Sequence, residues 1–151
     1  MLIKLLPALA LLASGVPALA QTGCPVPTLQ VLRDQKAVPA TGAALAPRAT
    51  LQLTPGAACA GKVSYQFTRA EITLVRGRRP LVPTRVVNQP EVDLAEFMSH
   101  GQPGDRLYVE VPFKDLQVVG ADGKPQPYPV PAPKPDGTVE TGVGFNWLIS
   151  Q

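Results

Sequence analysis

Few residues in this chain could carry chemistry. His100 is the single histidine, Ser99 precedes it, and three carboxylates lie close together at Glu91, Asp93 and Glu96. Nucleophilic catalysis needs a base held beside the nucleophile, and a protein metal site usually needs three or more ligands. Ser99 and His100 are adjacent on one turn and cannot form a nucleophile and base pair. No second histidine is present to complete a metal site. The sequence therefore predicts no catalytic residue and no metal site.

Acid–base catalysis on a glycan is not predicted either. It would need one carboxyl group with a raised pKa, whereas Asp93 and Glu96 have the spacing of a helix capping box. Asp105 follows a glycine at a strand entrance, where we expect it to bind backbone amides of the turn. No glycine pattern that could cradle a phosphate or a dinucleotide follows a strand and opens a helix. We therefore expect no cofactor and no enzymatic activity.

The one local concentration of charge is basic. Arg76, Arg78 and Arg79 surround a predicted hairpin turn, and Arg85 lies across from them. Nucleic-acid binding is not predicted, because aromatic residues do not interleave with these arginines and the net charge of the whole chain is only +3. The four arginines are then either a solvated hairpin tip or a contact for an acidic partner or an anionic cell-surface polymer.

The N-terminus has the organisation of a cleavable signal peptide. Lys4 precedes an apolar run, and Ala18-Leu19-Ala20 comes directly before Gln21, which is the pattern that signal peptidase recognises. We therefore predict a signal peptide over residues 1–20 and one mature domain over 21–151, located in the periplasm or secreted. No second apolar stretch is long enough to span a membrane.

The chain has two cysteines, Cys24 and Cys59. In an exported protein such a pair is expected to form a disulfide, because the compartment is oxidising. The alternative is that Cys24 carries a lipid, since the small residues Thr22 and Gly23 precede it. Gln21 argues against this alternative, because a lipoprotein signal has an apolar residue three positions before the cysteine.

The elements that must position these residues are predicted to be strands. Prolines and glycines separate short apolar runs, and no sustained helical period is present. We expect an all-β fold, a small two-layer, Ig-like sandwich of about eight short strands. In two places, near residues 68–70 and 114–115, the apolar alternation changes phase, which indicates a bulge or a bend by which the chain changes sheets. The expected strands cover residues 28–32, 50–54, 62–68, 72–74, 81–87, 107–113, 116–118 and 145–149.

One short helical turn is expected at Val92 to Gly101, with Leu94, Phe97 and Met98 on one face. Tight turns are predicted at Gly77, at Gly104-Asp105 and at Asp122-Gly123. The closing strand should place Trp147 between the two sheets.

Prolines occupy every second position of the segment 125–137, from Pro125 to Pro135. They remove alternate backbone donors, so this segment cannot be a central strand. We expect an extended strap about 34 Å long. It is either a docking strip that exposes Tyr128 to an aromatic-lined groove or a crossover that blunts a sheet edge.

The stretches Tyr65 to Pro80 and Gly104 to Val111, followed by the turn Asp122-Gly123, resemble the C-terminal domain of the gliding-motility protein GldM. The resemblance covers about residues 63–124 and includes the run Leu74-Val75-Arg76-Gly77. It implies a small β-sandwich that faces the periplasm of a bacterium of the Bacteroidota type, with partners in the type IX secretion and gliding machinery. It implies no catalytic or ligand-binding residue.

Together these observations predict a non-catalytic, exported module that binds an envelope protein. Its expected contact residues are Arg76, Arg78, Arg79, Arg85 and Tyr128. The alternative is an extracytoplasmic adhesion or glycan-binding module, in which exposed tyrosines such as Tyr108 and Tyr128 would stack on sugars.

Overall fold

A computed structural model describes residues 23–151. The expected signal peptide lies outside the described residues. The strands are β1 (Thr28–Arg33), β2 (Lys36–Ala37), β3 (Arg48–Thr54), β4 (Ser64–Phe67), β5 (Ala70–Arg76), β6 (Arg79–Pro80), β7 (Arg85–Val87), β8 (Glu91–Asp93), β9 (Arg106–Pro112), β10 (Leu116–Val119), β11 (Pro125–Pro127) and β12 (Gly142–Leu148). The helical segments are α1 (Ala95–His100) and the short turns η2 (Ala57–Cys59) and η3 (Phe113–Asp115). The predicted all-β class is confirmed.

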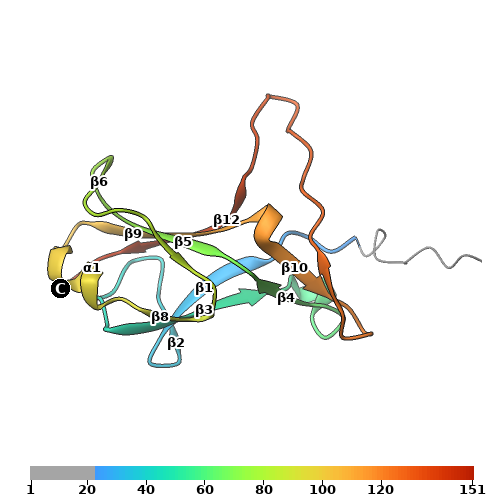
Figure 1. Cartoon of the computed structure of the whole chain (residues 1–151), viewed down its shortest axis with the longest axis horizontal. Helices are drawn as coiled ribbons and strands as arrows, with labels where there is room; N and C mark the ends of the chain where they lie inside the picture. Colours follow the sequence, from blue (N-terminus) through green and yellow to red (C-terminus); the bar gives the residue numbers. More distant parts are fainter. Residues whose placement is uncertain (1–22) are drawn as a thin grey trace, which may run out of the picture.

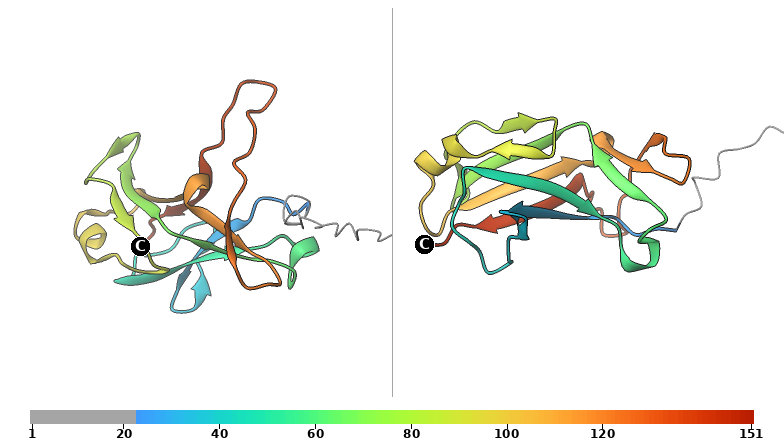
Figure 2. Two further views of the ribbon diagram at one scale, coloured as in Figure 1. Left: turned by 45° about the vertical axis from the view of Figure 1, so that its right-hand side comes forward. Right: turned by 90° about the horizontal axis from the view of Figure 1, so that it is seen from below.

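The strands form three antiparallel sheets. The first has the order β2-β1-β3-β8, and the second has the order β12-β9-β5-β6 with β7 also paired to β5. These two sheets stack as the layers of a sandwich (Figure 2). A third, small sheet, β11-β10-β4, lies at the end of the molecule opposite the C-terminus (Figure 1).

The two changes of apolar phase mark the places where the chain moves between sheets. β4 belongs to the small sheet and β5 to the second sheet, while β9 and β10 make the reverse move through η3. The two crossings lie side by side, because the amide of Thr68 donates to the carbonyl of Asp115 at 2.9 Å. The sequence was compatible with either a bulge or a bend between sheets at these two points. The structure shows that the chain changes sheet at both.

One hydrophobic core connects all three sheets, and Trp147 is its largest fully buried side chain. Its side chain is fully buried, as the alternation of the closing strand predicts. The indole Nε1 donates to the carbonyl of Ala43 at 2.9 Å, which satisfies its polar atom. A second, smaller cluster of Cys59, Val63 and Val118 lies beside the disulfide.

Two expected elements are different in the structure. Of the strand expected over 81–87, only β7 at residues 85–87 is present, and β6 lies before the expected range, because Pro80 and Pro83 lack the amides that a continuous ladder needs. The helix expected from Val92 begins only at Ala95, and no side chain caps it. Asp93 ends β8 instead, and its Oδ1 accepts a hydrogen bond from the amide of Ala95 at 2.9 Å.

The helical face is also narrower than expected. Leu94 and Phe97 are buried in the core, but Met98 is 41% exposed. A helix as short as α1 has only one turn to bury, so the third apolar residue faces solvent.

The alternating prolines do not form one straight strap. Residues 125–127 form the edge strand β11, and residues 128–141 then project from the sandwich and return to β12 (Figure 1). We call residues 128–141 the proline arm. Its tip is a tight turn, in which Gly137, with φ of +82°, donates to the carbonyl of Lys134. The Asp136-Gly137 turn reverses the chain, which the alternation of prolines alone did not predict.

Candidate interaction surfaces

The residues considered for catalysis do not converge. The Ser99 hydroxyl donates to the carbonyl of Glu96 at 2.7 Å, within its own helix, and His100 is exposed at the end of that helix. Glu91 lies on β8, on the exposed side of the first sheet. Among residues 23–151 no three histidine, cysteine, aspartate or glutamate side chains are grouped to hold a metal ion.

Asp105 is the one buried charged residue of the described chain, and it connects its own turn to the end of β5 and to the segment after β12. Its carboxylate accepts two hydrogen bonds from the Arg76 guanidinium, each 2.8 Å long, and one from the amide of Gln102. Its backbone carbonyl accepts from the amide of Ile149. The hydrogen bonds from Arg76 hold the pKa of Asp105 below its ordinary value. The expected role of Asp105, binding a turn amide, is therefore accompanied by an ion pair that the sequence did not predict.

The four arginines occupy three different environments. Arg76 is held by Asp105, and its Nη2 also reaches the carbonyl of His100 at 3.4 Å. Arg85 is half-buried, donates to the carbonyl of Asp93 at 3.2 Å and lies 3.9 Å from Glu96. Two arginines remain at the exposed tip of the β5–β6 hairpin.

Arg78 and Arg79 are those tip residues. Both are exposed, and neither has a side-chain hydrogen bond or ion pair with another described residue. The hairpin projects from the sandwich beside β9 (Figure 1). These two guanidinium groups are therefore available to an acidic partner, whereas Arg76 belongs to the folded structure.

Tyr128 lies at the base of the proline arm and is only partly exposed. Its ring stacks on Phe113 with a centroid separation of 5.6 Å, and Tyr65 meets it edge-on at 6.2 Å. Its amide donates to the carbonyl of Leu116. Burial raises the pKa of Tyr128, and Tyr65 adds a smaller contribution in the same direction. Tyr128 therefore anchors the arm, and the exposed side chains of the arm are its valines.

Val130 and Val139 are those valines, and they are 61% and 58% exposed. With Pro112 and Phe113 they line a hollow of about 510 Å³ between the arm and the outer face of the second sheet. The other residues around this hollow are mostly charged: Glu71, Glu110, Glu140 and Lys114, together with Thr141.

The three carboxylates at this hollow already have partners within the chain. Arg69 binds Glu71 at 2.7 Å, and the Thr141 hydroxyl donates to Glu110 at 2.7 Å. Lys134 pairs with Glu140 within the arm. Arg69, Lys134 and Lys114 together balance the three carboxylates, so this hollow has no net charge.

Tyr108 is the aromatic residue on the open face of the second sheet. It is 41% exposed, and its ring extends over Gly144, where any Cβ would come within 2.7 Å of the tyrosine oxygen. Partial burial raises the pKa of Tyr108, and the charge of Glu110 raises it further. This tyrosine lies flat on the sheet, as a sugar-stacking residue would.

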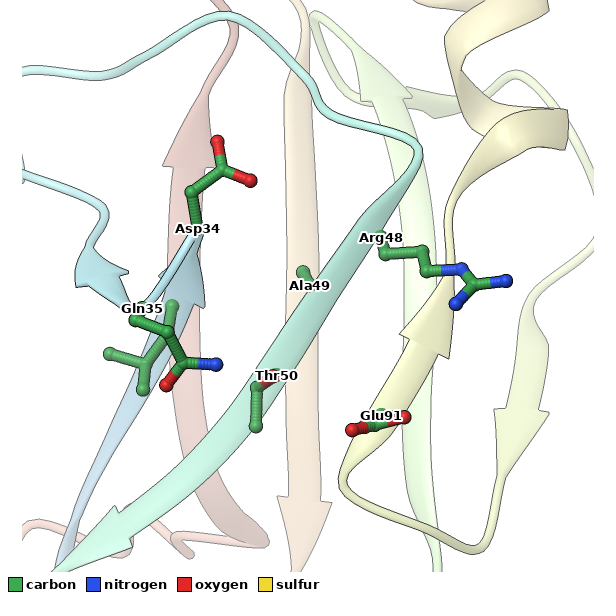
Figure 3. Close-up of a pocket in the computed structure, with 7 residues that line it drawn as sticks. Asp34, Gln35, Arg48, Ala49, Thr50 and Glu91 are labelled. Carbon is green, nitrogen blue, oxygen red and sulfur yellow. The ribbon is translucent and has the colours of Figure 1, made fainter.

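A further hollow, of about 200 Å³, lies beside β3 (Figure 3). Asp34 and Gln35 border it on one side, and Arg48 and Glu91 on the other. The side chains do not point toward a common centre (Figure 3). Both Asp34 and Gln35 have positive φ, the backbone of a two-residue hairpin turn. The hollow therefore reflects turn geometry and does not bring together a nucleophile and a base.

The predicted disulfide is confirmed. Cys24 and Cys59 are bonded, with their Cα atoms 5.9 Å apart, and no cysteine of the chain is left free in the described residues. The bond ties the first described residues to η2, next to the small sheet. No helix in residues 23–151 has the length and apolar composition needed to cross a membrane.

Comparisons of the chain with models of protein families, with curated proteins and with solved structures find no match.

Sequence reasoning missed the partners of several residues. The pairing of Arg76 with Asp105 and the stacking of Phe113 on Tyr128 join residues far apart in the chain. In the sequence, the pairing of Arg76 with Asp105 was visible only as an aspartate at a strand entrance and an arginine at a strand end. Such a signal becomes specific only when the register of β5 against β9 is known.

Proposed function

We propose that this protein is a non-catalytic, exported interaction module that binds an envelope protein through its proline arm. The observation that carries the proposal is that the arm projects from the sandwich and exposes Val130 and Val139, yet is held in one shape (Figure 1). Exposed apolar side chains on a projecting element are typical of a binding surface.

The arm is organised before any partner arrives. At its base Tyr128 stacks on Phe113, and the amide of Phe113 donates to the carbonyl of Thr141. At its tip the amide of Thr138 donates to the Asp136 carboxylate, and this bond holds the pKa of Asp136 below its ordinary value. Proline restricts the backbone in between. Binding through such a segment costs little conformational entropy, which favours affinity.

The hollow under the arm indicates the chemistry of the partner. Its apolar wall suits one aliphatic or aromatic side chain, whereas its carboxylates already have partners in the chain. We therefore expect the bound segment to place an apolar residue in the hollow.

Paired variants test the arm. Val130→Asp with Val139→Asp should abolish cross-linking of the tagged mature protein to its partners in the native envelope. Met98→Asp is the control, because Met98 is 41% exposed but lies on α1, at the other end of the sandwich (Figure 1). The proposal is wrong if the arm variant recovers the same partners as the control.

Glycan binding is the second candidate, and Tyr108 is the observation that favours it. Tyr108→Ala should then reduce binding to envelope polysaccharide, measured by affinity electrophoresis, while Val130→Asp leaves it unchanged. Equal mobility of parent and Tyr108→Ala would exclude this role.

The cellular setting is proposed from the disulfide and from the resemblance. A disulfide is typical of an extracytoplasmic protein, and the resemblance over residues 63–124 adds the type IX secretion and gliding machinery as the proposed context. Intact mass of the exported protein tests the first part. It should correspond to a chain beginning at Gln21 with one disulfide and no lipid, and an acylated Cys24 would contradict it.

A further inference from the structure

The strand β4 is an open edge of the small sheet. It pairs with β10 on one side only, and the amide of Thr68 at its end also bonds toward that side. Because the direction of backbone groups alternates along a strand, the N–H and C=O groups of Tyr65 and Phe67 point to the opposite, open side. No other described residue hydrogen-bonds to these groups.

A groove of about 490 Å³ runs along this open edge. Residues 65–68 line it along β4, Leu51 and Leu53 of β3 contribute apolar surface, and Asn88 and Pro90 also line it. The groove exists because the ladder between β3 and β8 ends at Pro90. Leu51 donates to the carbonyl of Pro90 at 2.9 Å, but proline has no amide with which to return the bond.

The lining of the groove is uncharged. Charged residues make up 17% of the chain, yet none of the residues around the groove is charged: Leu51, Leu53, Tyr65, Gln66, Phe67, Thr68, Asn88, Pro90 and Gln117. A charged segment would lose its hydration here without gaining an ionic partner, so the groove selects against it. Backbone groups on one side and apolar side chains nearby suit an extended chain with alternating apolar residues.

We propose that β4 accepts an extended, uncharged segment of a partner protein as an added strand of the small sheet. The other edge of the same sheet is blocked against such pairing. Gln126 and Tyr128 direct their amides toward β10, so Pro125 and Pro127 face outward with no donor to offer. One edge of the sheet is closed by proline and the other, which has no proline, is lined by a groove.

Backbone recognition can be tested with a synthetic probe. The probe is an acetylated and amidated heptapeptide of alternating threonine and valine, added to the ¹⁵N-labelled mature protein. The amides of Tyr65 and Phe67 should exchange rapidly in the free protein and become protected as the peptide saturates. A peptide N-methylated at alternate residues, on the face that pairs with β4, should bind about tenfold more weakly or worse.

Two adjacent substitutions provide the matched control. Asn88→Asp places a charge in the groove and should weaken binding of the neutral peptide about threefold or more. Gln89→Asp makes a similar change next to it, but Gln89 lines a different hollow and should leave binding unchanged. The arm variant with Val130→Asp and Val139→Asp should bind the peptide like the parent, so this site and the arm can fail independently.

Three results would overturn the proposal. The first is that Tyr65 and Phe67 gain no protection at millimolar peptide, and the second is that the N-methylated peptide binds as well as the parent peptide. The third is protection of the same amides that rises with protein concentration in the absence of peptide, together with a dimer in sedimentation. That result would assign the edge to a second copy of the chain.

Discussion

Among residues 23–151, polar groups are hydrogen-bonded within the fold at one end of the sandwich and left without partners at the other. At the C-terminal end, the buried Asp105 receives three hydrogen bonds, and the indole of Trp147 donates to a carbonyl. At the disulfide end, the small sheet leaves the backbone of Tyr65 and Phe67 open beside a groove, and the proline arm projects sideways from the sandwich nearby (Figure 1). The closed end pairs its buried polar groups within the fold, and only surface groups such as Arg78 and Arg79 remain there for a partner. The open end offers both a backbone edge and exposed valines for binding.

The largest effect is expected at the closed end. Trp147→Ala should lower the free energy of unfolding by about 3–5 kcal/mol, because it removes the largest fully buried side chain of the core. Denaturant melts measure this change. Tyr108→Ala on the exposed face is the comparison and should cost much less, and a loss below about 1 kcal/mol for Trp147→Ala would show that β12 is only loosely attached.

The second prediction concerns the disulfide, which stabilises the open end. Replacing Cys24 and Cys59 by serine should cost about 3–4 kcal/mol in the chain-entropy model, since the bond closes a loop of 35 residues. The damage should concentrate near Val63 and Val118, which pack beside the bond. Hydrogen exchange should show those amides opening more than the amide of Ile149, and uniform opening would contradict a local role.

The third prediction tests the ion pair of the closed end through pH. The pKa of Asp105 is lowered in the folded protein, from an unfolded value of about 3.9. Its stabilising contribution is therefore complete above that value and is lost as the pH falls through the folded pKa. Asp105→Ala should cost about 1–3 kcal/mol at neutral pH.

Two further variants isolate the charge. Asp105→Asn and Arg76→Gln should each flatten the fall of stability in acid, because each removes the charged pair. Urea melts at several pH values measure the slope, and a slope identical to that of the parent in both variants would mean that the pair does not contribute.

The smallest effect is expected at the hairpin tip. Arg78→Gln with Arg79→Gln should change the free energy of unfolding by less than about 0.5 kcal/mol per site, because both side chains are exposed. If the tip contacts an acidic partner, capture should weaken and lose its salt dependence. Unchanged capture at all salt concentrations would show that the tip is only solvated. Arg76→Gln, in contrast, should destabilise the protein.

The comparison of the four arginines shows how far sequence reasoning can go. Their clustering in the chain indicates a basic hairpin, and the hairpin is present. Whether each guanidinium is free depends on which segment lies opposite in space. Arg76 meets Asp105 because β5 and β9 pair with Val75 opposite Arg106, and this register is not visible in the local pattern.

The sequence by itself determined the properties that depend on neighbouring residues. Alternation of apolar residues indicated most of the strands and two points at which the chain bulges or bends between sheets, the turn residues located several of the hairpins, and the isolated cysteines indicated their bond. The tertiary structure alone decided which edges are open, which charges are paired and which aromatic rings stack. Those outcomes arise from contacts between distant segments, such as the Pro90 carbonyl with Leu51 or the ring of Tyr128 on Phe113. Their free energies depend on register and on the packing of the sheets, which no single segment encodes.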